Sequence, residues 1–214
     1  MADHLVGVLE IFTGTVTPAS VTEAKYEDIV LWKRMVSPHV PFGTIGYDWN
    51  WTSRYLGCRL LEIPQNRTVV AYQLRVKGTK GGFPLGQVIL SFPYPSPGDT
   101  SLDCVFVWLL AKAPTDALVK NGINGKYSVL GPLLDIAVQV SLDNGLDGRI
   151  GLHAAVSESK DESDALAARY TALGLSRRAA ARGRFRPFRP NDGRLFYLTE
   201  ADAAVFSAQF DSLR

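Results

Sequence analysis

The feature of this chain that most constrains its fold is a change of hydrophobic period around residues 105–141. Residues 105–111 form an unbroken apolar run typical of a buried strand, whereas Leu130 to Ser141 space their apolar side chains as an amphipathic helix does. The turn Lys126–Gly131 separates the two, and Pro132 suits a first helical turn. This order predicts a place for a phosphate, because the unbonded N–H groups and aligned dipoles at a helix start favour an anion.

The whole pattern predicts a single α/β or α+β domain, with antiparallel strands first and alternating strands and helices after them. Short turns between the early strands favour antiparallel pairing. The capping pattern at Ser159 and the glycine at Gly174 mark the two ends of one helix. Residues 42–56, rich in glycine and aromatic side chains, predict an irregular packed loop. The expected helices are 19–36, 130–144, 160–173 and 200–213, and the expected strands are 59–63, 68–77, 86–92, 102–113, 149–156 and 194–198.

The composition is that of an ordinary globular protein, with 46% hydrophobic and 21% charged residues and a net charge of +2. The chain has no run of eighteen apolar residues, which predicts no membrane span, and its first residues lack the pattern of a signal peptide. Cys104 lies in an apolar run and is expected to be a buried thiol, which favours the reducing cytoplasm. The histidines His4, His39 and His153 are scattered, so we expect no metal site.

Three segments within residues 68–198 resemble the GCN5-related N-acetyltransferase (GNAT) superfamily. They are the strand Val107–Pro114, the helix–turn–strand run Leu133–Leu152, and Ala168–Leu175, which is similar to the family's Tyr-x-x-x-Gly-Phe helix ending. The resemblance implies a mixed central sheet of mostly antiparallel strands, flanked by helices and with splayed central strands at the cofactor site. It also implies acetyl-CoA as the cofactor and direct transfer of the acetyl group to an amine.

The same resemblance divides the chain into an acceptor region, a core and a C-terminal helix, with bounds 1–60, 68–198 and 199–214. In the core, the edge of the strand that ends at Lys112 would pair with the pantetheine amides and polarise the acetyl carbonyl. The cofactor turn keeps its basic residue and its last glycine, whereas Val129 stands where the family has its first glycine. The implied cofactor residues are Leu110, Ala111, Lys112, Lys126, Tyr127, Ser128, Val129, Leu130, Gly131 and Ser157.

The catalytic assignments concern an acid and a base. Tyr170 matches the family's tyrosine, which implies a phenol that donates a proton to the leaving thiolate; packing of the ring at helical spacing is the alternative. A base must take a proton from the acceptor ammonium, and Asp103 is our candidate, with Glu62 and His153 left open. His153 has an apolar, small-residue setting that favours a core histidine.

The segment Arg177–Arg194 concentrates positive charge, with seven arginines and one aspartate. It could contact the phosphates of a nucleic acid and stack bases on Phe185 and Phe188, bind an acidic partner, or form a solvated loop. Two other functions therefore stay open beside the acetyltransferase: a catalytically inactive module that binds CoA or a protein, and a toxin-type aminoacyl-tRNA acetyltransferase. The expected partner is an amine-bearing acceptor, and no membrane is expected; the edge strands and the C-terminal helix leave a homodimer open.

Overall fold

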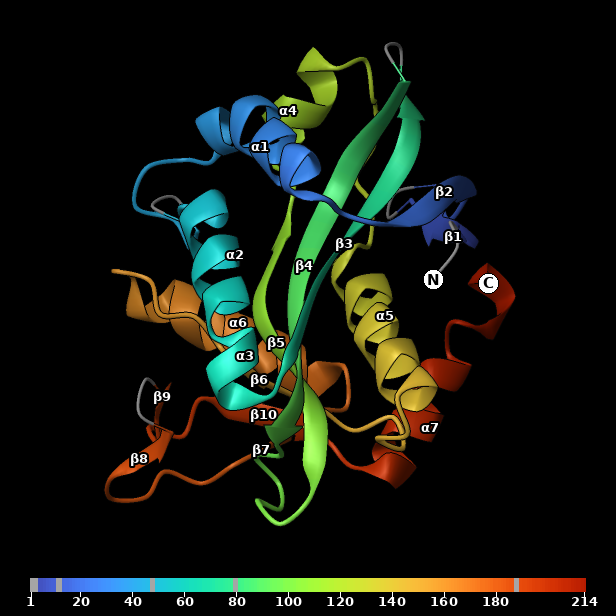
Figure 1. Ribbon diagram of the computed structural model, residues 1–214. Helices are drawn as coiled ribbons and strands as arrows, with labels where there is room; N and C mark the ends of the chain where they lie inside the picture. The colour runs from blue at the N-terminus through green and yellow to red at the C-terminus, as the bar shows by residue number, and fades with distance from the viewer. Residues whose placement is uncertain (1–3, 11–12, 47–48, 79–80, 187–188) are drawn as a thin grey trace.

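The computed structural model describes residues 4–10, 13–46, 49–78, 81–186 and 189–214, and eight of its strands form one sheet (Figure 1). The strand order in this sheet is β1-β2-β3-β4-β5-β6-β10-β7, and β8 and β9 form a separate hairpin. The strands are β1 (His4–Leu9), β2 (Val16–Glu23), β3 (Thr68–Gly78), β4 (Gly81–Pro95), β5 (Asp103–Lys112), β6 (Ile150–His153), β7 (Ser176–Arg177), β8 (Arg184–Arg186), β9 (Arg189–Pro190) and β10 (Leu195–Leu198). The helices are α1 (Tyr26–Met35), η1 (Ser37–His39), α2 (Trp51–Leu60), α3 (Glu62–Gln65), α4 (Thr115–Lys120), α5 (Leu130–Asp143), α6 (Lys160–Ala172), α7 (Glu200–Ala208) and η2 (Asp211–Leu213).

The sheet is mixed, as expected. Strands β1 to β5 pair antiparallel with their neighbours, β5 and β6 pair in parallel, and β10 pairs antiparallel with both β6 and β7. Helices α1 and α2 lie on one side of the central strands, and α5 and α7 lie on the other (Figure 1). The predicted α/β architecture, with one mixed sheet flanked by helices, is confirmed.

Register assigns side chains to the two faces. Leu152 is paired with both Val107 and Phe196, so these three side chains lie on one face of the sheet, within the main hydrophobic core that α5 covers. His153 follows Leu152 and is paired with Leu195, so both lie on the opposite face. The ring of Tyr170 from α6 lies 5.4 Å from the ring of Phe196, which places Tyr170 on the α5 face.

The N-terminal third is where the sequence-based expectations were wrong. Residues 19–23 belong to β2 rather than to a helix, because the run Ser20–Thr22 is paired on both sides, with β1 and β3. Part of the expected loop 42–56 and the expected strand 59–63 form α2 and α3 instead. Asn50 caps α2 by accepting the Ser53 N–H, and the buried Trp51 packs on Trp32. Tyr47, counted among the loop aromatics, lies outside the described residues.

From β3 onward, the expectations were largely confirmed. The strands β3 and β5 and the helices α5 and α6 begin and end within a residue or two of the expected positions. Ser159 caps α6 by accepting the Glu162 N–H, and Gly174 has the positive φ of a residue that ends a helix. Cys104 is a fully buried thiol. The expected loop between β5 and α5 contains the short helix α4.

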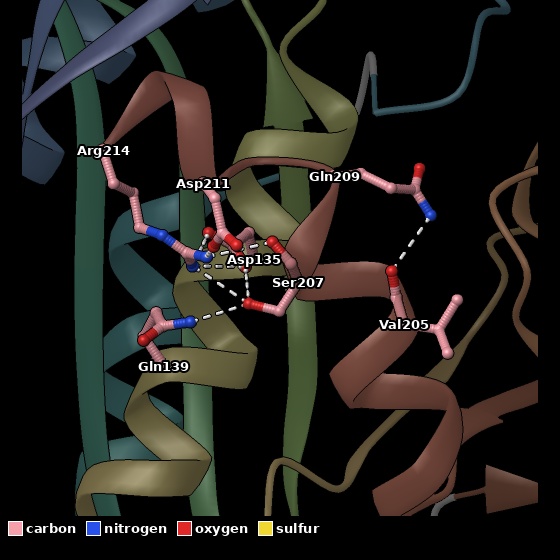
Figure 2. A network of polar contacts seen from close by, with 7 residues as sticks. All are labelled: Asp135, Gln139, Val205, Ser207, Gln209, Asp211 and Arg214. Atoms are coloured by element: carbon pink, nitrogen blue, oxygen red, sulfur yellow. Dashed lines mark hydrogen bonds and ion pairs between the residues drawn. The ribbon is translucent and has the colours of Figure 1, made fainter.

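An ion pair between the buried Asp135 and the partly exposed Arg214 joins the C-terminal segment to α5 (Figure 2). The carboxylate of Asp135 receives two hydrogen bonds from the Arg214 guanidinium, at 2.8 and 3.1 Å, and one from the Ser207 hydroxyl at 2.6 Å. Gln139, one helical turn further, donates to the same hydroxyl. Burial raises the pKa of Asp135, while Ser207 and Arg214 oppose that shift. The network holds η2 against α5 and beside β1.

Candidate functional site

The site begins where the parallel ladder between β5 and β6 stops. Their last pair is Val107 with Leu152, yet β5 continues to Lys112, and over these residues β4 is its one partner in the described part of the chain. The side chains of residues 108–111 are consequently half-exposed, although β5 is an inner strand of the sheet. The central strands therefore part at this point and leave an edge of β5 open to a ligand.

A β-bulge decides which backbone groups face this open edge. Before the bulge, Val105 donates its N–H to Arg149 and so faces β6. Trp108 is an extra residue, because Val107 is paired with Leu90 while Leu109 is paired with Ile89. Beyond the bulge, Ala113 donates its N–H to Leu85 of β4. Alternation along the strand then turns the N–H and C=O groups of Leu110 and Lys112 toward the open edge, and those of Ala111 toward β4.

The helix start of α5 lies beside the end of β5. Val129 is the residue before α5, with φ −107°, and its side chain is 4% exposed. A Cβ at Gly86, which is paired with Lys112, would lie 2.5 Å from the Val129 side chain. Val129 therefore points into the core and needs no glycine-like backbone. Its side chain leaves the N–H groups of Leu130 and Gly131 at the helix start uncovered by the helix itself.

Other residues of the turn are held by neighbouring segments. Tyr127 is buried and forms an antiparallel bridge with Glu10, whereas Lys126 and Ser128 are exposed. The ring of Phe210 lies where Gly131 would carry a Cβ, at 2.7 Å. Gly131 is thus required by the packing of the C-terminal segment, which is a sufficient reason for a glycine at this position.

Three cations gather around the open end of β5. Burial lowers the pKa of Lys112, and the nearby positive charges of Arg169 and Lys126 lower it further. The three residues come from β5, from the turn before α5 and from α6. Their mutual repulsion makes this region attractive to an anion, which would relieve it. Sequence reasoning missed Arg169, because a lone exposed arginine on a helix has no distinguishing pattern.

Tyr170 lies on the same face, buried in α6. Its side chain is 6% exposed, and burial raises the pKa of its phenol to about 12, with the positive charge of Arg194 opposing the shift. Since Phe196, its ring neighbour, is paired with Leu152, Tyr170 lies close to the level at which β5 and β6 part. The phenol is therefore protonated at neutral pH, as a proton donor must be.

Ser157, in the segment between β6 and α6, contacts both the loop between α1 and α2 and the start of α6. Its hydroxyl contacts the Glu162 carboxylate and the Gly43 carbonyl oxygen, and Glu162 also accepts the N–H of Ile45 at 3.3 Å. These hydrogen bonds hold the segment 43–45, from the loop between α1 and α2, against the start of α6. The Ser157 hydroxyl takes part in two of them.

The structure does not bring the other carboxylate candidates to the open edge. Asp103 begins β5, nine residues before Lys112 and so about 30 Å away along the strand. Glu62 pairs with Arg59 and accepts the N–H of Val69. His153, in contrast, is the last residue of β6 and follows Leu152, which belongs to the last β5–β6 pair. Its Nε2 lies 2.9 Å from Asp192 Oδ1.

Several arginines of the segment 177–194 have structural partners. Arg194 donates to the carbonyl oxygens of Ala154, Ala155 and Ser163, and Arg178 donates to Pro97. These hydrogen bonds give both guanidinium groups a structural role in holding the segment. Phe188 lies outside the described residues.

A cavity of about 280 Å³ lies away from the open edge, between β1, β2, α5 and the C-terminal segment. Apolar side chains line most of it, together with the Asp135–Arg214 pair. No helix among the described residues has the length and apolarity needed to cross a membrane.

The chain matches no protein-family model and no curated protein. Solved structures align with most of it. Mutant forms of the spermidine/spermine N-acetyltransferase SpeG from Vibrio cholerae are 13% identical, cover 88% of this chain and 98% of their own, and give a TM-score of 0.49. A mutant of the toxin AtaT, bound to acetyl-CoA and the C-terminus of the antitoxin AtaR, is 10% identical, covers 87% and 96%, and gives 0.43. Scores and identities this low carry no argument about family or activity.

Proposed function

We propose that this chain is a GNAT-type N-acyltransferase that moves an acetyl group from acetyl-CoA directly to an amine. The observation that carries the proposal is the open edge of β5, where the backbone groups of Leu110 and Lys112 face no strand among the described residues. A pantetheine arm carries amides that can complete such an edge as a further strand would. The helix start of α5 and the cations Lys112, Lys126 and Arg169 supply what its phosphates need.

Each group has a distinct task in this proposal. Acetyl-CoA supplies the activated thioester. The N–H of Leu110 faces the open edge and is positioned to donate to an acyl carbonyl oxygen, which would stabilise negative charge there. Tyr170, which is protonated and lies on the α5 face of the sheet, would give its proton to the leaving sulfur. Lys126 and Arg169 would bind the phosphates, and Ser157 would hold the loop over the site.

The test is a comparison of thermal stabilisation by acetyl-CoA and by ATP, followed by a thiol-release assay with a panel of amines. Only a ligand that binds the folded state raises the melting temperature, so selective stabilisation by acetyl-CoA supports a CoA site. Thiol release that depends on an amine supports transfer. Equal shifts with both ligands would contradict the proposal.

A catalytically inactive CoA-binding module is the alternative. The position of Asp103 favours it, because this candidate base lies at the end of β5 away from the open edge. Selective stabilisation by acetyl-CoA without thiol release in the presence of any amine would identify that function.

A further inference from the structure

His153 and Asp192 form a hydrogen-bonded pair at the fork, the point just past the pair Val107–Leu152 where β5 and β6 part. The imidazole Nε2 of His153 lies 2.9 Å from Asp192 Oδ1, and the same oxygen accepts the backbone N–H of Arg194 at 3.0 Å. Burial raises the pKa of Asp192, but the hydrogen bonds from His153 and from the backbone outweigh it and leave that pKa lowered. The carboxylate is therefore ionised and held in place at neutral pH.

This contact fixes the proton of the ring. An ionised carboxylate only accepts hydrogen bonds, so Nε2 must be the nitrogen that carries the proton. In the neutral imidazole Nδ1 then keeps a free electron pair, which can accept a proton from another group. The positive charge that would result is balanced by Asp192, as in other histidine–aspartate pairs. The side chain of His153 is 11% exposed, so one part of the ring can be reached from outside.

The position of the pair complements that of Tyr170. His153 is level with Trp108, the extra residue of the bulge, just below the open edge. It lies on the face opposite Phe196 and Tyr170, because Leu152 and His153 are neighbours on one strand. A group bound at the fork would thus have a phenol on one face of the sheet and an imidazole on the other.

We propose that His153 is the general base of the acyl transfer and that Asp192 is its positioning residue, with the amine approaching from the face opposite Tyr170. This inference rests on the function proposed above. Nδ1 of His153 takes one proton from the acceptor ammonium, and the nitrogen lone pair then forms the C–N bond as the C–S bond breaks. Tyr170 gives its proton to the sulfur and regains one from the same nitrogen. The imidazolium releases its proton to water, so one proton is produced per amide and thiol formed.

Two charged groups from the loop before β10 lie beside His153. Asp192 contacts Nε2 of the ring. Arg194 holds its guanidinium on the carbonyl oxygens of Ala154 and Ala155, directly after His153. The acidic carboxylates Asp103 and Glu62 do not lie at the fork, so neither competes for this role.

The test compares His153→Gln with Asp192→Asn. Glutamine keeps an N–H donor for Asp192 but cannot take a proton, so kcat/KM at pH 7 should fall by about 100-fold or more while stabilisation by acetyl-CoA stays unchanged. The acidic limb of the pH profile should disappear in this variant, because the rate then depends on amine that is already deprotonated. Asp192→Asn should give a smaller loss, since the ring persists but its orientation is no longer fixed.

A measurement without turnover separates this inference from the proposed function. The chain has three histidines, so ¹⁵N spectra of the imidazoles can be assigned with the His153→Gln variant. We expect an unprotonated Nδ1 in His153; a protonated Nδ1 overturns the inference. Unchanged kcat/KM and pH profile in His153→Gln also overturn it and leave the acyltransferase standing. Failure of the wild type to bind acetyl-CoA overturns both.

Discussion

The guanidinium of Arg214 lies 2.8 Å from the buried carboxylate of Asp135, so the C-terminal segment is fixed to the helix whose start forms part of the candidate site. Removing Arg214 leaves a carboxylate that is mostly out of water with fewer partners. We expect Arg214→Ala to lower the free energy of unfolding by about 1–3 kcal/mol, less than for a fully buried pair because Arg214 is 31% exposed. Urea unfolding measures this loss. Adding Asp135→Asn should restore part of it; an additive further loss would show that the pairing is unimportant.

The backbone assignment at the open edge is tested with proline, which lacks an N–H. Leu110→Pro removes a group that faces the open edge, so the fold should survive while acetyl-CoA affinity falls about 10-fold or more. Ala111→Pro is the matched control. It removes an N–H that faces β4 and should destabilise the sheet by about 3 kcal/mol or more. Calorimetry with acetyl-CoA and urea unfolding distinguish the two variants, and a reversed pattern would mean that the bulge does not shift the alternation.

Val129 offers a test of whether the turn needs the glycine of the family pattern. Val129→Gly should cost about 2–3 kcal/mol of stability, because it empties a packed position against Gly86 and adds backbone freedom. Acetyl-CoA affinity should not improve, since the valine side chain points into the core. Tighter binding in the folded variant would indicate that Val129 obstructs the phosphate site.

Tyr170→Phe should slow acetyl transfer by about 10²-fold or more while the affinity for acetyl-CoA stays within about 3-fold. The ring still packs on Phe196, so the fold is retained. Steady-state thiol release and calorimetry measure the two quantities. Tyr72→Phe, at a buried tyrosine of β3, is the control and should leave the rate unchanged. Equal rates for both variants would exclude the phenol as the acid.

The cation cluster predicts a salt-sensitive affinity. Arg169→Gln should weaken acetyl-CoA binding about 3- to 10-fold at low salt, and the difference should shrink as ionic strength rises. Lys33→Gln, on α1 at the other side of the sheet, should have no effect on binding. If both variants bind alike at every salt concentration, the cluster does not contact the phosphates.

Hydrophobic period identified the elements that carry most of the site. An apolar run marked strand β5, a helical period and Pro132 marked helix α5, and Ser159 and Gly174 at its ends marked helix α6, so Tyr170 and the turn could be placed from sequence. Residues 19–23 could not be assigned correctly from the sequence, because β-branched side chains at short spacing fit a helix start and a strand equally well. Their pairing partners, β1 and β3, lie far apart in sequence.

The contact between His153 and Asp192 is a second feature that could not be predicted from the sequence. Asp192 is 39 residues from His153 and belongs to a loop whose course is set by β10 and the β8–β9 hairpin. Neither residue has a neighbour in sequence that signals the contact. Asp103 lies on the strand that borders the site, but the register, whose last β5–β6 pair is Val107 with Leu152, shows that the strands part at the other end of β5.

The groups that face the open edge of β5 belong to the backbone, so the edge depends on the pairing of β5 with β4 more than on which side chains β5 carries. Leu109 and Leu110 have their own partners on β4, Ile89 and Val88. Deleting the extra residue Trp108 would therefore leave a regular ladder and keep the amide of Leu110 turned to the open edge. Substitutions other than proline along residues 108–112 also leave these backbone groups in place, and a search for sequence patterns cannot detect a site of this kind.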